Sequence, residues 1–197
     1  MGLIYTGVPP NLALSLKNQF LLETFVETGT LLGHTALWAC SHFSHVLSIE
    51  ADQQLYRLAC QKLKGIHNID LRYGKSEYVL KQIVCELDKP ALFWLDAHWS
   101  GPGTAGESYE CPLLDEIAVV DGQAREHIIL IDDARLFING PPPPHKRDQW
   151  PSIGVVIDHL RSQFPNTYIA IWNDVIVRVP GATQNRFEAL MQQSLPH

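Results

Sequence analysis

The chain has 197 residues, 46% of them hydrophobic, so its length and composition fit one buried core, and we expect a single domain over residues 1–197. A formal net charge of −6 leaves no excess of basic residues to neutralise phosphates, which argues against nucleic acid as the main partner. Four cysteines without CxxC spacing argue against a zinc site or a disulfide framework. With no signal peptide or apolar run long enough to span a membrane, the sequence predicts a cytoplasmic protein without membrane partners.

Hydrophobic periodicity predicts an N-terminal helical segment in residues 1–22, followed by strands that alternate with helices. The expected strands of this part are residues 24–27, 45–50, 68–73, 91–96 and 127–133. The expected helices between them are residues 35–41, 53–63, 76–87 and 112–120. A helix at residues 153–164 and two short strands at residues 168–172 and 175–179 complete the chain.

This order of elements predicts an α/β fold. Strands that alternate with helices form parallel sheets, because a right-handed crossover needs a helix between parallel neighbours. The pair Asn173-Asp174 separates the last two strands and is typical of a tight hairpin, so these strands should be antiparallel. We expect a Rossmann-like, doubly wound, seven-stranded and mostly parallel sheet with a C-terminal antiparallel hairpin and helices on both faces.

The first strand runs into a turn with the spacing Glu27-x-Gly29-x-x-x-Gly33. In open α/β sheets, ligands bind beyond the carboxyl ends of the strands, and glycines let the backbone approach them. A carboxylate at this position repels a pyrophosphate but attracts a cation. Glu50, at the end of the second strand, is placed to accept hydrogen bonds from ribose hydroxyls. The pattern therefore favours a nucleoside without phosphates, although both glycines also suit an ordinary turn.

Four segments in chain order resemble the motifs of class I S-adenosylmethionine-dependent methyltransferases: VETGTLLGHTA, SIEAD, RYGKSEYVL and ALFWLDAHW. The terminal hairpin fits the same family. The resemblance covers roughly residues 23–179 and is closest to the metal-dependent catechol O-methyltransferase and macrocin O-methyltransferase branches. It implies a methyltransferase fold with S-adenosylmethionine as cofactor.

The resemblance also implies roles for single residues at the cofactor site. Glu27 would face the ammonium group, Thr35 would bind the carboxylate, and Glu50 would bind the ribose. The other residues implied at this site are Gly29 and Gly33 beneath the cofactor, Ser76 near the adenine, and Asp96. For Ser76, an N-cap of the following helix is the alternative interpretation.

Three aspartates end two strands that should be neighbours, Asp96 on one and Asp132-Asp133 on the other. Carboxylates that converge at one sheet edge repel one another unless a cation lies among them, and oxygen ligands select Mg²⁺, Ca²⁺ or Mn²⁺. The metal-dependent branches hold magnesium with an aspartate and an Asp-Asp or Asp-Asn pair at the matching positions. We therefore expect a Mg²⁺ site here. The alternative is that Asp132 caps the next segment and Asp133 is solvated.

His98 is the candidate general base, since its unperturbed pKa of about 6.5 suits proton transfer near neutral pH. Here the sequence departs from both branches. The catechol type carries a lysine where this chain has Trp99, and the macrocin type carries an aspartate where it has His98. A contact to the metal site or to the substrate is the alternative role for His98.

Two further segments raise functional questions. The stretch GPGTAG, residues 101–106, fits GxGxxG but lies in the wrong context for a nucleotide loop, and we interpret it as a mobile loop on the acceptor side. The long stretch after Asp133 suits a functional lid. Its residues His145, Lys146, Arg147 and Trp150 either contact the acceptor or form an exposed connector.

The sequence thus predicts a metal-assisted O-methyltransferase that acts on a small hydroxylated acceptor, such as a sugar or a polyphenol. Two alternatives remain: a nicotinamide-dependent oxidoreductase on a similar sheet, and a non-catalytic nucleoside-binding module. The expected partner is a small molecule, with a homodimer as a further possibility.

Overall fold

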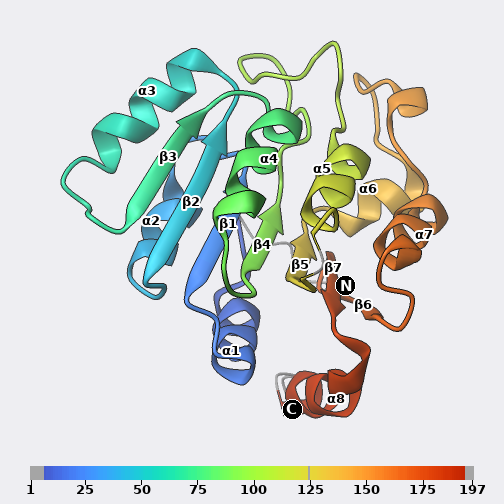
Figure 1. Cartoon of the computed structure of the whole chain (residues 1–197). Helices are drawn as coiled ribbons and strands as arrows, with labels where there is room; N and C mark the ends of the chain where they lie inside the picture. The colour runs from blue at the N-terminus through green and yellow to red at the C-terminus, as the bar shows by residue number, and fades with distance from the viewer. Residues whose placement is uncertain (1–6, 124, 194–197) are drawn as a thin grey trace.

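A computed structural model describes residues 7–123 and 125–193, and its centre is a seven-stranded sheet of order β3-β2-β1-β4-β5-β7-β6 (Figure 1). The strands are β1 (Thr24–Thr28), β2 (His45–Glu50), β3 (Ile69–Tyr73), β4 (Leu92–Leu95), β5 (Ile128–Ile131), β6 (Tyr168–Trp172) and β7 (Val175–Val179). Strands β1 to β5 are parallel, and β7 is antiparallel to both β5 and β6. The predicted fold class is confirmed. The first six residues of the expected N-terminal segment lie outside the described residues.

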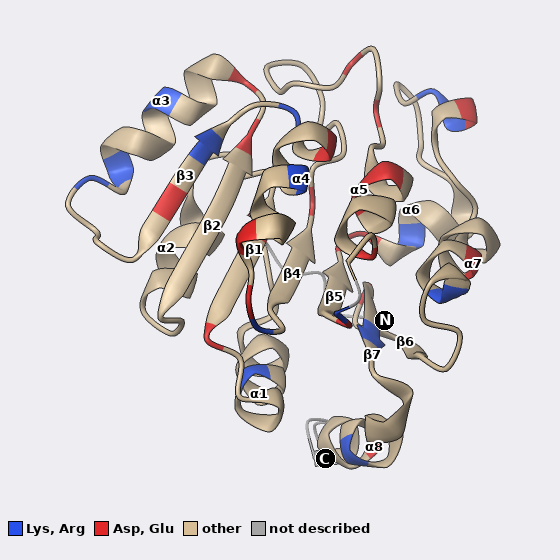
Figure 2. Ribbon diagram, in the orientation of Figure 1, with Lys and Arg blue, Asp and Glu red and all other residues tan. Residues whose placement is uncertain are grey.

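Helices cover both faces of the sheet. They are α1 (Pro10–Phe20), α2 (His34–Cys40), α3 (Gln53–Lys62), α4 (Ser76–Glu86), α5 (Leu113–Val120), α6 (Ala134–Asn139), α7 (Ile153–Ser162) and α8 (Gln184–Gln193). One core cluster joins the sheet to α4, α5, α6 and α7, and two others join it to α1, α2, α3 and α8. No helix among the described residues is long and apolar enough to cross a membrane. In Figure 2, acidic and basic residues are interspersed over the ribbon, in agreement with the modest net charge of −6.

The two central strands, LFWL in β4 and IILI in β5, are buried along their whole length. Apolar side chains on both faces are what a parallel strand between two helix layers requires. In the register of the sheet, Thr28 lies opposite Leu95, and Leu95 lies opposite Ile131. These three residues end β1, β4 and β5, so the residues that follow the three strands meet at one edge of the sheet, the upper edge in Figure 1.

The predicted C-terminal hairpin is confirmed, and its turn lies close to the same edge of the sheet. Asn173 and Asp174 both have positive φ, 44° and 69°, as a two-residue hairpin turn with the right-handed twist of its strands requires. The backbone oxygen of Asp174 accepts a 2.8 Å hydrogen bond from Ala134 N, and its Oδ1 accepts one of 2.7 Å from Arg135 N. The hairpin turn therefore holds the first turn of α6 against the end of β5.

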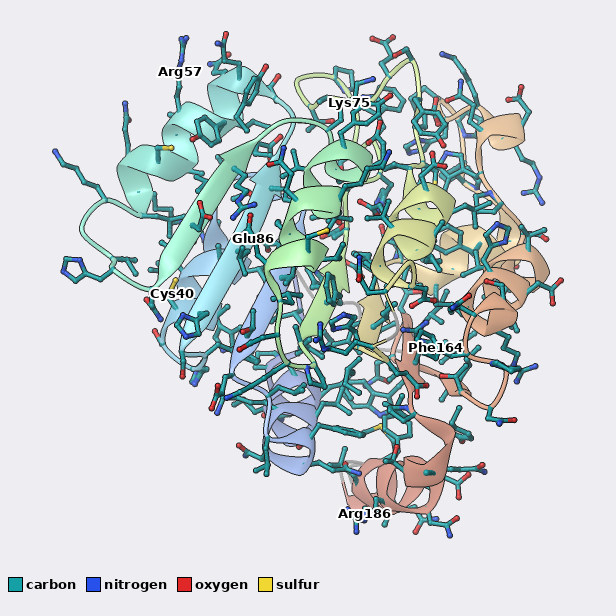
Figure 3. All side chains as sticks on the ribbon, viewed as in Figure 1. Cys40, Arg57, Lys75, Glu86, Phe164 and Arg186 are labelled. Carbon is teal, nitrogen blue, oxygen red and sulfur yellow. The ribbon has the colours of Figure 1, made fainter. Side chains whose placement is uncertain are left out.

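A buried ion pair ties β7 to the end of α5. Arg178 is 0% exposed, pairs with Asp121 and donates a 3.2 Å hydrogen bond to the backbone oxygen of His127. Its guanidinium also lies 5.5 Å from the ring centre of Phe164, which Figure 3 labels. Removing one partner of such a pair leaves the other charge buried without compensation.

We expect Asp121→Asn to lower the free energy of unfolding by about 3–5 kcal/mol, because Arg178 stays charged and buried. Asp158→Asn, an exposed position on α7, should change it by less than about 0.5 kcal/mol. Urea denaturation of both variants gives the comparison. Equal stability of the two variants would show that the Arg178 charge does not depend on Asp121.

Candidate active site

A cavity opens at the carboxyl ends of β1, β2, β3 and β4, and encloses about 910 Å³ of space outside protein atoms, open solvent included. Five of the residues expected from the sequence line it: Gly29, Glu50, Ser76, Asp96 and His98. Figure 3 labels Lys75, another lining residue, at this upper edge of the sheet.

Gly29 must be glycine for two geometric reasons. Its φ is +83°, in the left-handed region, and a Cβ atom built on it would lie 2.2 Å from the backbone oxygen of Asp96. Its N–H donates a 3.0 Å hydrogen bond to Ile49 O. The turn therefore passes directly over the ends of β2 and β4, and the predicted approach of its backbone to a ligand stays a prediction.

Glu50 holds the turn and faces the cavity. Its Oε2 accepts a 2.7 Å hydrogen bond from Leu31 N, and its Oε1 accepts one of 2.8 Å from Asp52 N. Burial raises the pKa of this carboxyl, although the backbone donors favour its ionised form. Each carboxylate oxygen has a second lone pair, so Glu50 can still accept hydrogen bonds from two ligand hydroxyls.

The other residues expected in the first turn, Glu27, Gly33 and Thr35, are not among the residues that line the cavity. Glu27 is 1% exposed, and its carboxylate hydrogen-bonds to Ser48 Oγ and to Thr35. Burial, followed by the nearby charges of Asp96 and Glu50, raises the pKa of Glu27 to about 8. Glu27 therefore lies behind the cavity wall.

Ser76 lies at the start of α4, where the helix N-cap position belongs to Lys75. The alternative interpretation of Ser76 as the N-cap is therefore wrong. Ser76 is 4% exposed, and its hydroxyl hydrogen-bonds to Glu116 of α5. Burial raises the pKa of Glu116 to about 7. Ser76 thus joins the cavity wall to a buried carboxyl that the sequence analysis missed.

A second cavity adjoins the first and encloses about 870 Å³ of space outside protein atoms, open solvent included. It lies between the end of β4, α6 and the segment that follows α6. His98 and Ser100 line both cavities, so these two residues stand at the junction. Its wall includes the ionisable side chains of Asp133, Arg135 and His145.

His98 lies between two carboxylates. Its Nε2 is 3.0 Å from Asp133 Oδ2, and its Nδ1 is 3.6 Å from Asp96 Oδ1, beyond a hydrogen bond. Burial alone lowers the pKa of an imidazole, but the Asp133 hydrogen bond and the charges of Asp96, Asp133 and Asp132 outweigh it. The pKa of His98 is therefore raised above its ordinary value.

The three aspartates meet at this edge as expected, but their arrangement does not fit a divalent ion. The Asp133 carboxylate is paired with His98 and Arg135, and Asp132 Oδ1 accepts a 2.8 Å hydrogen bond from Asp133 N. Burial and the charges of Asp96 and Asp133 raise the pKa of Asp132 to about 8. Among the described residues, no three histidine, cysteine, aspartate or glutamate side chains are placed to hold a metal. The Mg²⁺ prediction therefore has no support from this geometry.

The loop before α5 differs from its predicted role. Thr104, Ala105, Gly106, Ser108 and Tyr109 line the first cavity instead of the second, so the loop covers the expected cofactor side. The sequence placed it on the acceptor side, because GxGxxG without a flanking strand and helix gave no reason to put it near a nucleoside.

The sequence matches no protein-family model and no curated protein. Solved structures match the fold. The structure is similar to that of a candidate caffeoyl-CoA O-methyltransferase from Staphylococcus aureus, with 14% identity, a TM-score of 0.62 and coverage of 90% of this chain and 86% of that one. It is also similar to the methyltransferase PaMTH1 of Podospora anserina with S-adenosylhomocysteine bound, with 16% identity, a TM-score of 0.58 and coverage of 88% of each chain.

A candidate O-methyltransferase from Klebsiella pneumoniae is a third similar structure, with 16% identity, a TM-score of 0.55 and coverage of 89% of this chain and 82% of that one. At these identities, the similarity establishes the fold alone. The chain therefore has the fold of the S-adenosylmethionine-dependent methyltransferases, as the sequence motifs predicted.

Proposed function

We propose that this protein transfers a methyl group from S-adenosylmethionine to a hydroxyl group of a small acceptor. The observation that carries this proposal is the pair of adjoining cavities with His98 at their junction. One cavity has the glycine turn and the strand-end carboxylate that suit a nucleoside, and the other has Asp133, Arg135 and His145 in its wall. The methyltransferase fold and the sequence motifs support the same conclusion.

The first cavity fits S-adenosylmethionine by the chemistry of its wall. Glu50 can bind the ribose hydroxyls, and the apolar side chains Leu31, Ile49 and Leu55 can pack against the adenine. Glu27, behind the turn, is close enough to Asp96 and Glu50 for their charges to raise its pKa, so a ligand ammonium beside them would favour its ionised form. When bound, S-adenosylmethionine supplies an activated methyl group.

The acceptor must lose a proton as its oxygen is methylated, and His98 is placed to take it. Asp133 accepts a hydrogen bond from Nε2–H, which leaves Nδ1 with a lone pair. Nδ1 is too far from Asp96 for a hydrogen bond, so an acceptor hydroxyl at the junction of the two cavities can donate to it. Asp133 both orients the imidazole and stabilises its protonated form.

No step of this mechanism needs Mg²⁺, so binding of the ion is a separate question. Calorimetric titration of MgCl₂ into the protein saturated with S-adenosylhomocysteine tests it. If Mg²⁺ binds the unaltered protein and Asp132→Asn abolishes that binding, the result supports a metal site at Asp132. Equal heats for both proteins would exclude Asp132 as a ligand.

The proposed function is tested by incubating the protein with S-adenosylmethionine labelled in its methyl group and a set of sugars and polyphenols. We expect labelled ether products from at least one hydroxylated compound and none from its fully methylated counterpart. Transfer to amines alone would contradict O-methylation, and no transfer together with absent cofactor binding would contradict the proposal as a whole.

A proton should leave Glu27 when the cofactor product binds. Because its pKa in the free protein is about 8, Glu27 is mostly protonated at pH 7, and the ligand ammonium lowers that pKa. Calorimetry of S-adenosylhomocysteine binding at pH 7, in buffers of different ionisation enthalpy, should show net proton release that diminishes toward pH 9. Glu27→Gln should abolish the release. Unchanged release in this variant would assign the proton to another group.

A further inference from the structure

Glu110 is a fully buried carboxylate that joins the loop before α5 to the segment between α6 and α7. It is 0% exposed, and its Oε2 accepts a 2.9 Å hydrogen bond from Trp150 Nε1. Both carboxylate oxygens lie within 3.1 Å of Lys146 N, and Oε2 is 3.3 Å from His145 Nδ1. Three groups of the second segment therefore converge on one carboxylate of the first.

The chemistry of these partners fixes the direction of each hydrogen bond. An indole N–H and a backbone N–H can only donate, so Glu110 acts as the acceptor. Burial alone would raise the pKa of Glu110, but the donors from Trp150, Lys146 and His145 outweigh it and lower the pKa. A carboxylate opposite His145 Nδ1 requires a proton on that nitrogen. In the neutral imidazole, Nε2 then carries a lone pair.

His145 is held in this orientation by two tryptophans. Its ring centre lies 5.2 Å from that of Trp99 and 5.4 Å from that of Trp150, both in edge-to-face arrangements. His145 lines the second cavity, and among the described residues its Nδ1 bonds Glu110 while no hydrogen bond to its Nε2 is found. His145 therefore gives this cavity an oriented hydrogen-bond acceptor.

His98 and His145 share one neighbour. The ring centre of His98 lies 5.3 Å from that of Trp150, and both histidines line the second cavity. The two imidazoles are thus close enough for a single small molecule to contact both. The Nδ1 atom of His98 is available to the hydroxyl that reacts, and Nε2 of His145 is available to another group of the same molecule.

We propose that His145 recognises a second hydroxyl group of the acceptor, through a hydrogen bond from that hydroxyl to Nε2, and that Glu110 is the positioning residue that sets its tautomer. The acceptor is then a compound with at least two hydroxyl groups, of which one reacts beside His98. The inference rests on the proposed function and adds the class of acceptor and the residue that selects it.

The test is the ¹⁵N NMR spectrum of the imidazole groups at pH 8, in the full chain saturated with S-adenosylhomocysteine. The signals of His145 are assigned by their loss in His145→Gln. We expect His145 to carry its proton on Nδ1. Phenol should shift the Nε2 signal, because its hydroxyl can donate to Nε2, whereas anisole, which has the same ring without that donor, should not.

Glu110→Gln separates positioning from a merely structural role. In a folded variant, the amide no longer requires a proton on Nδ1, so His145 should populate both tautomers and respond less to phenol. If this variant does not fold, the tautomer of His145 in the unaltered protein still tests the inference. In the methyl-transfer assay, His145→Gln should raise the KM of the acceptor about tenfold with little change in kcat, as expected for one lost hydrogen bond.

Three results would overturn the inference: a proton on Nε2 of His145 in the unaltered protein, the same response to phenol and anisole, or no response to either. Failure of S-adenosylhomocysteine to bind would instead contradict the proposed function. The tautomer of His145 can be read in that case too, so the two failures are distinguishable.

Discussion

Glu50→Ala is expected to lower the affinity for S-adenosylhomocysteine about 100-fold or more. Hydrogen bonds to a charged acceptor contribute about 1.5–3 kcal/mol each, and Glu50 can receive two of them from the ribose. The same substitution frees Leu31 N, whose hydrogen bond to Oε2 holds the glycine turn in place. Isothermal titration calorimetry measures the affinity, and the ligand-dependent rise in melting temperature should shrink in parallel.

The matched control is Asp88→Ala, which removes an exposed carboxylate from the turn between α4 and β4. The affinity of Asp88→Ala for S-adenosylhomocysteine should equal that of the unaltered protein. Tight binding by folded Glu50→Ala would mean that the ribose lies elsewhere, and the assignment of the first cavity to the cofactor would then be wrong.

His98→Gln is expected to lower kcat by a factor of about 10²–10⁴, the usual contribution of a general base. Glutamine keeps a polar group at the junction but cannot take up the proton. In the unaltered protein, the rate should fall as the pH drops through the pKa of His98, since only the neutral imidazole accepts a proton. That pKa lies above the ordinary histidine value, so the loss should begin at a correspondingly higher pH.

Cofactor affinity should change little in His98→Gln, because Glu50 and the glycine turn provide the contacts to the nucleoside. His67→Gln, at an exposed position between α3 and β3, controls for the loss of a histidine. A kcat of His98→Gln equal to that of His67→Gln across pH 6 to 9 would place the base elsewhere.

The fold was predictable because its signals are local. Runs such as LFWL and IILI, buried on both faces, and the Asn173-Asp174 turn each specify an element without distant partners. Helix α6 was missed, since its six residues, which end at Asn139, are too few to show a helical period. Helix α8 was also missed and lies beyond the last predicted strand.

The candidate site was predictable only in part, because its details depend on contacts between distant segments. Strand order placed Glu50, Asp96 and His98 at one edge. It could not reveal that the Asp133 carboxylate would meet His98 and Arg135, which weakens the metal site. Nor does a sequence pattern indicate that Glu110 would be buried against Trp150, which lies 40 positions further along the chain.

The central claim is that the first cavity binds the nucleoside of S-adenosylmethionine, and equilibrium binding of S-adenosylhomocysteine and NADH, compared by calorimetry on the same protein, tests it most directly. The proposal predicts saturable binding of S-adenosylhomocysteine, a higher melting temperature in its presence, and no heat with NADH. Binding of NADH with no response to S-adenosylhomocysteine would contradict the account and favour the oxidoreductase alternative.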